Sequence, residues 1–535
     1  MSRLINFKPT GTPPPEGQIE ITVRLKPGKG RKEMLDLEML SQPPSRRKGM
    51  SRNDLLNSFK ADEADLTTVK KFASDNNLTL VGEDPNKRTI YLSGTIRNME
   101  KAFNTTLNYY EHEDSRDGIK QTFISNDEEI IVPEDLKEVV EGIVGLSNTP
   151  YSRSGDIRME RESATSTLDV NYTGDQYAKL YKFPSDLTGK GQKIALIELG
   201  GGYLLPDIEN YFSKLAKMPV PKITQHSVND ATNNPGEDLF NDVEVTMDIE
   251  VAGSAAPDAS IEVYFAPGHA RGLMEAILAA THDGCQVISI SWGKLESKVF
   301  DVDKNAISNA LREAANLSST VLCASGDFGS TGKLLATGAS TLNVQFPASS
   351  PYALACGGTS VTVENNEIKN EVVWNAFWVP GNEQRASGGG FSNGFGPSFP
   401  NLRPPYQTNV LPTRYSNQLK RGIPDISASA DLSGIGHKII FQSKVENGGG
   451  TSAVAPLLAG LFARINEKMG DQGFVNGMLY QLTSNHDTYR QVLQGNNNIA
   501  KDQSVWDAGD VWNPCTGLGT PNGVKILEGF EALNS

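Results

Sequence analysis

The amino-acid sequence predicts an α/β protein in which a doubly wound parallel-sheet domain follows a small α+β domain. The chain has 535 residues, too many for one ordinary domain. From about Lys193 onward, short apolar strands alternate with helices, which is typical of a parallel sheet covered on both faces. Strands and amphipathic helices also alternate before Ser147. We therefore expect domains at 1–148 and 173–535, joined by a linker at 149–172.

The first domain contains two predicted strands and three predicted helices. The runs IEITVRLKP and RTIYLSGT, at 19–27 and 88–95, are rich in residues that favour strands. Apolar residues recur at helical spacing in 65–78, 96–107 and 133–146. The linker that follows is polar, charged and without apolar periodicity, so we predict that it is exposed and open to proteolysis.

The second domain contains a series of predicted parallel strands. They read KIALIEL, SIEVYFAP, VISISWG and TVLCASGD along the chain. In doubly wound sheets the functional site lies at the carboxyl ends of the strands. Glu198, Trp292 and Asp327 stand at such ends, and we expect them to lie near one another.

Composition excludes several classes of protein. The net charge is -14 and the sequence pI is about 5.1, whereas a nucleic-acid-binding protein would present a basic face. No window of about 20 apolar residues predicts a membrane span. The N-terminus lacks the apolar core of a conventional secretory signal peptide. The four cysteines are too few for a disulfide framework, and we expect buried free thiols.

The stretch GGGTSAVAP, at 448–456, has the features of a nucleophile's surroundings. Glycines lead into Thr451 and Ser452, and the apolar run that follows is predicted to be helical. Backbone N–H groups at a helix N-terminus stabilise developing negative charge. A serine hydroxyl still needs a base to take its proton. None of the six histidines lies in the His-Gly context of a subtilisin-like triad.

Two carboxylates are the better candidates for that base. Glu244 and Asp248 are four residues apart in NDVEVTMDIEVAGSAAP, which on a helix places them on one face, about 5–6 Å apart. The same stretch alternates apolar and polar residues, which favours a strand. In a strand the two would be roughly 13 Å apart, too far to cooperate. The local pattern leaves helix and strand open.

Asp327, in ASGDFGS, also has two interpretations. Aspartates are common in turns, and the glycines around Asp327 favour one. A protonated carboxyl can instead donate a hydrogen bond to an oxyanion.

The chain resembles the sedolisins, the serine-carboxyl peptidases, and among them the kumamolisin-like pro-enzymes. The resemblance runs through the whole chain in the family's order. It includes IALIELGGGY, EVTMDIEVAGSAAP, ISISWG, ASGDFGS, SGGGFSNGF, PDISASAD, GGTSAVAPLLAG and PCTGLGTPNG.

The resemblance implies an acid-active, self-processing endopeptidase on a subtilisin-like fold, acting on proteins or peptides. It makes Ser452 the nucleophile, Glu244 the base, Asp248 the group that orients the base, and Asp327 the oxyanion donor. Glu198 and Trp292 extend the acid network, and 241–257 becomes a helix. The first domain is then a propeptide that assists folding and inhibits the enzyme until it is cut off.

Two further expectations follow. A catalytically silent homologue that acts as a binding or scaffold protein is the alternative function. The acid chemistry implies export without a conventional signal peptide, with the cytoplasm as the other possibility.

No cofactor is required for this chemistry, but sedolisins hold a structural calcium ion. The matching loop positions are Gln491, Val492, Gly509, Val511 and Asn513. Two amides, Gln491 and Asn513, stand where the family has aspartates. Because calcium affinity rises with ligand charge, we expect this site to be severely weakened.

Overall fold

The computed structural model describes most of the chain. The described residues are 9–28, 34–47, 52–113, 120–153, 157–158, 171–332, 342–378, 383–394, 403–485, 487–499 and 506–535. They form a small hydrophobic core within residues 19–146, a large one built mainly from residues after 171, and a third cluster of Tyr110, Phe123 and Phe300.

The large core surrounds an eight-stranded sheet, which confirms the predicted doubly wound domain. The strands of its main path, in spatial order, are β11 (Ile223–Ser227), β12 (Ser260–Phe265), β10 (Lys193–Glu198), β13 (Val287–Ile290), β15 (Thr320–Ala324), β17 (Leu354–Glu364) and β18 (Glu367–Val373). All pair in parallel except β18, which returns antiparallel to β17. β23 (Ile426–Ser429) also pairs in parallel with β17.

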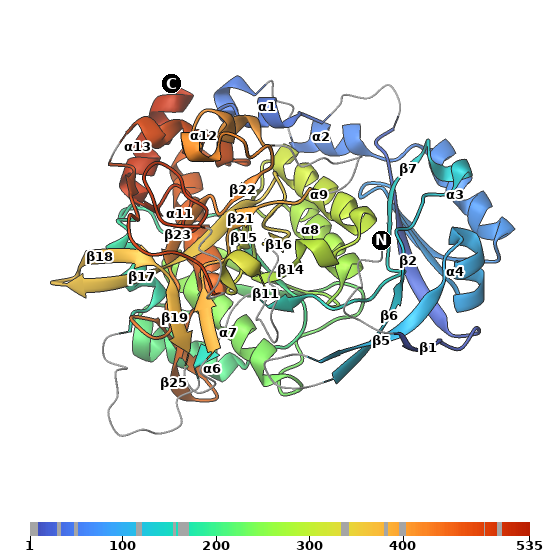
Figure 1. Cartoon of the computed structure of the whole chain (residues 1–535), viewed down its shortest axis with the longest axis horizontal. Coiled ribbons are helices and arrows are strands. Elements are labelled where there is room, and N and C mark those ends of the chain that lie inside the picture. The colour runs from blue at the N-terminus through green and yellow to red at the C-terminus, as the bar shows by residue number, and fades with distance from the viewer. Residues whose placement is uncertain are drawn as a thin grey trace.

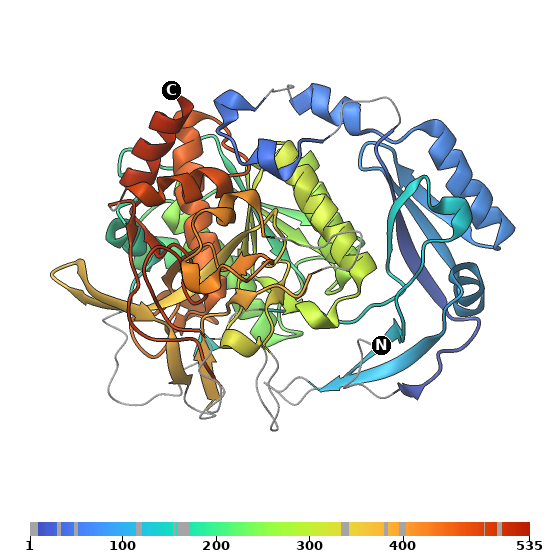
Figure 2. The same ribbon diagram turned by 45° about the horizontal axis from the view of Figure 1, so that its top comes forward.

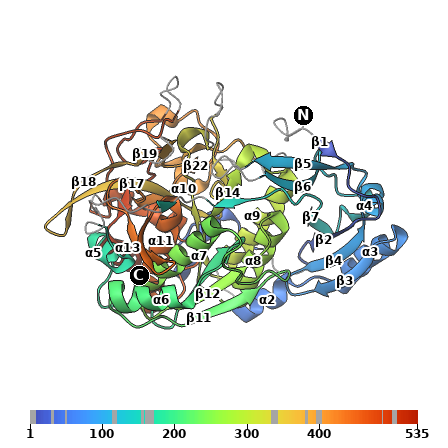
Figure 3. The same cartoon turned by 90° about the horizontal axis from the view of Figure 1, so that it is seen from below.

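Helices cover both faces of this sheet (Figures 1 and 3). On one face α7 (Leu239–Ala255) packs against α11 (Thr451–Met469) and α5 (Gly174–Leu180). On the other face α8 (Ala270–His282) packs against α9 (Asp301–Asn316). The sheet strands are buried almost throughout, as expected for a parallel sheet between two helical layers.

The small core belongs to an antiparallel sheet of β3 (Thr79–Asp84), β4 (Thr89–Thr95), β2 (Gln18–Leu25) and β7 (Val140–Val144), in that order. Helices α3 (Glu63–Asp75) and α4 (Ile96–Phe103) cover it. A second sheet joins β1 (Pro9–Gly11), β5 (Leu107–Glu113) and β6 (Lys120–Asn126). The predicted strands at 19–27 and 88–95 and the helices at 65–78 and 96–107 are confirmed, apart from their ends.

The predicted helix at 133–146 is wrong. The segment forms a short 3-10 turn, Glu134–Leu136, and then strand β7, which pairs with β2. Val139, Val140, Ile143 and Val144 are β-branched and buried, and such residues pack well on a sheet. The apolar spacing was compatible with both structures, and the neighbouring strand decided between them.

The small domain docks on helices α8 and α9 of the large one (Figure 1). The Glu313 carboxylate of α9 accepts hydrogen bonds from Arg24 Nη2 at 2.5 Å and Arg88 Nη2 at 2.6 Å. His282 Nε2 lies 2.7 Å from the other Glu313 oxygen. Arg24, Arg88 and Glu313 are fully buried, so this anchor joins the domains through desolvated ion pairs.

Residues 34–47 extend from the small domain over the large one. Figure 2 shows their blue segment, with helix α1 (Leu37–Leu40), across the top of the molecule. The Leu35 N–H donates to Asn316 Oδ1 at 2.8 Å, and Arg47 donates to the backbone oxygens of Gln472 and Phe474. The small domain is therefore held at two separate places.

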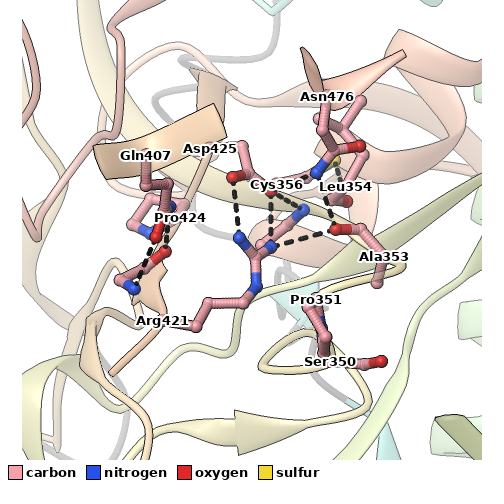
Figure 4. A network of polar contacts seen from close by, with 12 residues as sticks. Ser350, Pro351, Ala353, Leu354, Cys356, Gln407, Arg421, Pro424, Asp425 and Asn476 are labelled. Carbon is pink, nitrogen blue, oxygen red and sulfur yellow. Dashed lines mark hydrogen bonds and ion pairs between the residues drawn. The ribbon is translucent and has the colours of Figure 1, made fainter. Parts of the chain in front are cut away.

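A buried ion pair braces the far end of the large sheet (Figure 4). Arg421 donates to both carboxylate oxygens of Asp425, at 3.0 and 2.7 Å, and to the Ala353 carbonyl at 2.9 Å. Asp425 also accepts from the Ala355 N–H at 2.7 Å and from Asn476 at 3.3 Å. Asp425, the first aspartate of the PDISASAD motif, therefore has a structural role.

The described residues also form other helices and strands, in both domains and in the linker. They are α2 (Arg52–Phe59), α6 (Leu205–Asn210), α10 (Pro405–Thr408), α12 (Asn476–Gln481), α13 (Gly523–Asn534), β8 (Ser152–Arg153), β9 (Ile157–Arg158), β14 (Trp292–Leu295), β16 (Gln345–Phe346), β19 (Asn375–Trp378), β20 (Glu383–Ala386), β21 (Gly390–Phe391), β22 (Gly422–Ile423), β24 (His437–Phe441), β25 (Lys444–Gly448), β26 (Tyr489–Arg490) and β27 (Thr520–Pro521). Among the described helices, none is both long and apolar enough to cross a bilayer. The four cysteines are free and buried, as predicted.

Candidate active site

Ser452 lies at the start of a buried helix. Strand β25 ends at Gly448, and α11 begins at Thr451, so Ser452 is the second residue of the helix. Gly450 turns the chain between them with a φ of 81°, a conformation that residues with a Cβ rarely adopt. Ser452 is fully buried, and its Oγ lies 3.4 Å from the Ser291 carbonyl oxygen. The helix N-terminus would favour negative charge at this point.

Helix α7 brings two carboxylates to the same place. The helix crosses α11 closely, because a Cβ at Gly460 would lie 2.5 Å from the Ala255 Cβ. Glu244 and Asp248 are one turn apart on α7 and fully buried. The structure therefore resolves the open question at 241–257 in favour of a helix, which ends at Ala255.

Ser291 links Asp248 to Ser452, and the sequence did not reveal it. Its Oγ donates to Asp248 Oδ2 at 2.7 Å and lies 3.3 Å from the Ser452 carbonyl oxygen. Its own carbonyl oxygen lies 3.4 Å from Ser452 Oγ. The only available signal was its position at the carboxyl end of VISIS, next to Trp292.

Glu198 and Trp292 form the next layer of the site. Trp292 Nε1 donates to Glu198 Oε2 at 3.1 Å. Burial raises the pKa of Glu198 well above its usual range. The hydrogen bond from Trp292 lowers this pKa, and the Glu244 charge raises it further. Burial also raises the pKa of Asp248, and the charges of Glu198 and Glu244 raise it further, against the Ser291 hydrogen bond.

These pKa shifts have a chemical consequence. The pKa values of Glu198 and Asp248 are both raised, and the Glu244 charge contributes to both shifts, so the three buried carboxyl groups do not all ionise together and share protons. This cluster of carboxyl groups can therefore exchange a proton with a serine hydroxyl at pH values at which an ordinary pair of carboxylates would be fully ionised.

Asp327 is fixed beside the nucleophile by the residue before Ser452. The Thr451 N–H and the Thr451 hydroxyl both donate to Asp327 Oδ1, at 2.9 and 2.8 Å. The Thr451 Oγ1 in turn accepts from the Gly326 N–H at 3.0 Å. Asp327 is 1% exposed. A proton on the other oxygen, Oδ2, would make this carboxyl a hydrogen-bond donor.

The histidines whose side chains the structure describes have partners elsewhere. His226 pairs with Glu262 at 2.8 Å, and His282 pairs with Glu313. His269 caps helix α8, and burial, together with Arg271, lowers its pKa to about 4. His437 contacts the Ser429 carbonyl at 3.0 Å, and burial lowers its pKa to about 4. The side chains of His112 and His486 lie outside the described residues.

The loop that matches the family's calcium site does not fit a cation well. Asn513 Oδ1 accepts from the backbone N–H groups of Cys515 and Thr516, at 3.0 and 2.9 Å. Asn513 Nδ2 donates to the Gly509 carbonyl at 2.9 Å, and Gln491 Nε2 donates to the Leu518 carbonyl. Val492 is buried and Val511 is exposed with a φ of 63°. The Gly509 carbonyl and Asn513 Oδ1, two oxygens at the positions that match the calcium loop, therefore already accept hydrogen bonds within the protein.

The start of the predicted linker is bound rather than exposed. Tyr151 is 5% exposed, and β8 pairs antiparallel with Trp292 and Gly293 of β14. Strand β9 pairs with Asn447 and Gly448 of β25, just before Ser452. The predicted exposure is wrong for Tyr151, because the chain here pairs with the edge of a neighbouring strand. Residues 159–170 of the predicted linker lie outside the described residues.

The fold and the site define a serine-type peptidase of subtilisin-like architecture with an N-terminal activation domain. The family model "Pro-kumamolisin, activation domain" matches residues 6–149, and the subtilase family model matches 231–503. Kumamolisin of Bacillus sp. (strain MN-32) is 36% identical over 527 residues, which are 96% of this chain and 91% of that protein. The chain belongs to the sedolisin family.

Two further comparisons agree with this placement. Sedolisin of Pseudomonas sp. (strain 101) is 26% identical over 510 residues, covering 91% of this chain and 83% of that protein. A solved structure of Pseudomonas sedolisin, complexed with two molecules of pseudo-iodotyrostatin, covers 68% of this chain and 99% of its own, with a TM-score of 0.61 and 24% identity. That likeness shows the fold.

Proposed function

We propose that this protein is an acid-active endopeptidase in which a carboxylate, not a histidine, activates the nucleophile. Ser452 attacks the peptide carbonyl, Glu244 takes its proton, and Asp248 orients Glu244. The observation that carries this proposal is the buried group of Glu198, Glu244 and Asp248, which Ser291 joins to Ser452.

Acid suits both ends of the proposed mechanism. An unperturbed glutamate has a pKa of about 4.3, so a carboxylate base keeps working at pH values at which a histidine is protonated. Asp327 supplies the opposite limit, because its carboxyl can donate to the developing oxyanion only when protonated. Thr451 holds it next to the nucleophile. Activity then requires an ionised base and a neutral donor together.

We also propose that the first domain is an intramolecular inhibitor that the enzyme removes itself. Two short strands of the linker pair with strands of the large domain on the two sides of Ser452: β8 pairs with β14, and β9 pairs with β25. A site that takes chain on both sides of the nucleophile suits cleavage within a polypeptide. The bond that is cut first should lie between Arg153 and Ile157.

The test is self-processing of the purified proenzyme. At about pH 4 the intact 57.9 kDa chain should disappear and yield a new N-terminus within 154–157. N-terminal sequencing and intact-mass spectrometry measure this, with Ser452→Ala as the control that stays whole. A first cut elsewhere would contradict the proposed path of the linker, and a stable proenzyme at every acid pH would contradict self-processing.

The alternative function, a catalytically silent homologue that only binds peptides, predicts a different result in the self-processing assay. Such a protein would bind its linker but never cut it. The retained Ser452, Glu244, Asp248 and Asp327 argue against it, since a binding protein gains nothing from a buried cluster of carboxyl groups in which the Glu244 charge raises the pKa of both Glu198 and Asp248.

We propose that the 491–513 loop works without calcium. The Asn513 amide already donates to the Gly509 carbonyl, and the Gln491 amide donates to the Leu518 carbonyl, so both amides at the family's aspartate positions serve the loop itself. Ligands that bind only the native state raise its stability by mass action, so calcium should leave the melting temperature nearly unchanged. Differential scanning calorimetry with added calcium or chelator measures this. A saturable rise that Asn513→Ala removes would overturn the proposal.

The working location follows from the chemistry. We propose that the enzyme acts in an acidic medium outside the cytoplasm, where its carboxyl groups take up the required protons. Cell fractionation, followed by detection of the processed form, tests this.

A further inference from the structure

The bound linker identifies a side-chain pocket next to the proposed catalytic centre. Tyr151 is 5% exposed, and its N–H donates to the Gly268 carbonyl at 2.8 Å. The Lys294 ammonium lies 5.8 Å from the centroid of the Tyr151 ring. One backbone contact and one side chain therefore hold this residue, four positions after Ser147 at the end of the small domain.

The linker strand lies where a substrate strand would lie. Ser152 pairs with Gly293 and Arg153 pairs with Trp292, so the chain runs toward Ser291 and the nucleophile. The opposite edge of β14 is already paired with β16. When the small domain leaves, the β8 edge of β14 becomes a strand edge that can accept an incoming peptide by main-chain hydrogen bonds.

We propose that the Tyr151 pocket is a specificity site of the peptidase, and that Lys294 makes it select an aromatic side chain. The selected position lies two residues before the one that pairs with Trp292. This inference rests on the proposed function, because it takes the bound linker as a model of a substrate.

The charges around the pocket support an aromatic occupant. A lysine ammonium over a ring face attracts the ring's negative face, more strongly where both are shielded from water. Burial lowers the pKa of Lys294 to about 7. The Lys298 charge lowers this pKa further, and the Asp303 charge opposes the shift. In acid the side chain is therefore charged. A basic substrate side chain would meet this ammonium and be repelled.

The ring rather than the hydroxyl of Tyr151 is recognised. The Tyr151 hydroxyl is buried, and no hydrogen-bond partner for it is found among the described residues. Burial raises its pKa well above the usual range, and the Asp303 charge raises it further. A buried hydroxyl without a partner is unfavourable, so phenylalanine should be accepted at least as well as tyrosine.

The experiment uses processed enzyme at about pH 4 and quenched peptides with the sequence of residues 147–160. The residue at position 151 is varied among Phe, Tyr, Leu, Ala, Lys and Glu, and mass spectrometry identifies the bond cut. We expect kcat/KM for Phe and Tyr to exceed that for Ala and Lys about tenfold, with Phe not below Tyr. Lys294→Met should remove the preference of Phe over Leu. Lys193→Met, which changes a half-buried strand lysine at the amino end of β10, away from the site, should keep it.

Each outcome decides the inference. Equal kcat/KM for all residues at position 151 would overturn the proposed specificity site, and so would the same preference of Phe over Leu in the wild type and in Lys294→Met. In either case, hydrolysis of denatured casein would still support the proposed peptidase activity. If neither casein nor any peptide is cut, the proposed function fails and this inference fails with it. Because the wild-type series is sufficient by itself, the inference stays testable even if Lys294→Met does not fold.

Discussion

Ser452→Ala is expected to lower kcat by on the order of 10⁶-fold and to leave the proenzyme uncut. The serine hydroxyl forms the covalent bond with the substrate, and alanine cannot replace it. Glu244→Ala should cost nearly as much, because without a base the hydroxyl keeps its proton. Groups that act as a unit fail together, so the double variant should be no slower than Ser452→Ala alone.

The variants need a route to the processed form that does not depend on their own activity. A recognition sequence for an unrelated protease, placed within 159–170, supplies one. Quenched-peptide hydrolysis then measures turnover, and circular dichroism verifies folding. His269→Ala and His282→Ala are the matched controls and should keep most of the activity. Loss of activity in either, with Glu244→Ala active, would make a histidine the base.

Glu313→Ala is expected to lower the unfolding free energy of the proenzyme by about 3–5 kcal/mol. Arg24 and Arg88 donate to this carboxylate at 2.5 and 2.6 Å, and all three groups are buried. Removing the carboxylate leaves two arginines in the interface with one fewer partner. Urea unfolding in the Ser452→Ala background measures the effect on an intact chain.

The matched control removes a glutamate from an exposed ion pair of the small domain. Glu16 pairs with Arg97, and both side chains are more than 60% exposed, at 69% and 67%. Exposed pairs contribute about 0–1 kcal/mol, so Glu16→Ala should have little effect. An equal effect of the two variants would show that the Glu313 anchor does not hold the domains together.

This anchor should also resist acid. Burial alone would raise the pKa of Glu313, but Arg24, Arg88 and His282 outweigh it and hold that pKa well below its usual range. Its contribution is therefore complete above the unfolded glutamate pKa of about 4.3, and is lost only as the pH falls through the lower folded value. The effect of Glu313→Ala should thus be nearly the same at pH 5 as at pH 7. Acid alone should therefore not release this contact.

Local sequence patterns predicted the strands and helices of the large domain well. KIALIEL and VISISWG are short, apolar and followed by polar groups, and both are parallel strands. The pattern failed to classify α7, because that helix is buried on nearly all sides, including Glu244 and Asp248. A helix without an exposed face has no helical period for the sequence to display. There the family resemblance, not periodicity, gave the right structure.

Contacts between distant segments could not be predicted in the same way. Arg24 and Glu313 are 289 residues apart, and Ser291 and Ser452 are 161 apart. Nothing in the residues around Ser291 distinguishes it from any other serine at the end of a strand. The candidate site was found from the residue types that the chemistry needs, whereas its supporting groups required the fold.

The pH dependence of kcat/KM for processed enzyme tests the carboxylate-base mechanism most directly. An ionised Glu244 and a protonated Asp327 are both required, so hydrolysis of a quenched peptide should follow a bell with its maximum at about pH 3–5. Removing one oxyanion donor typically costs about 10²–10³ in rate, so the alkaline limb should be steep. A maximum at about pH 7–8, where a histidine base works best, would contradict the mechanism.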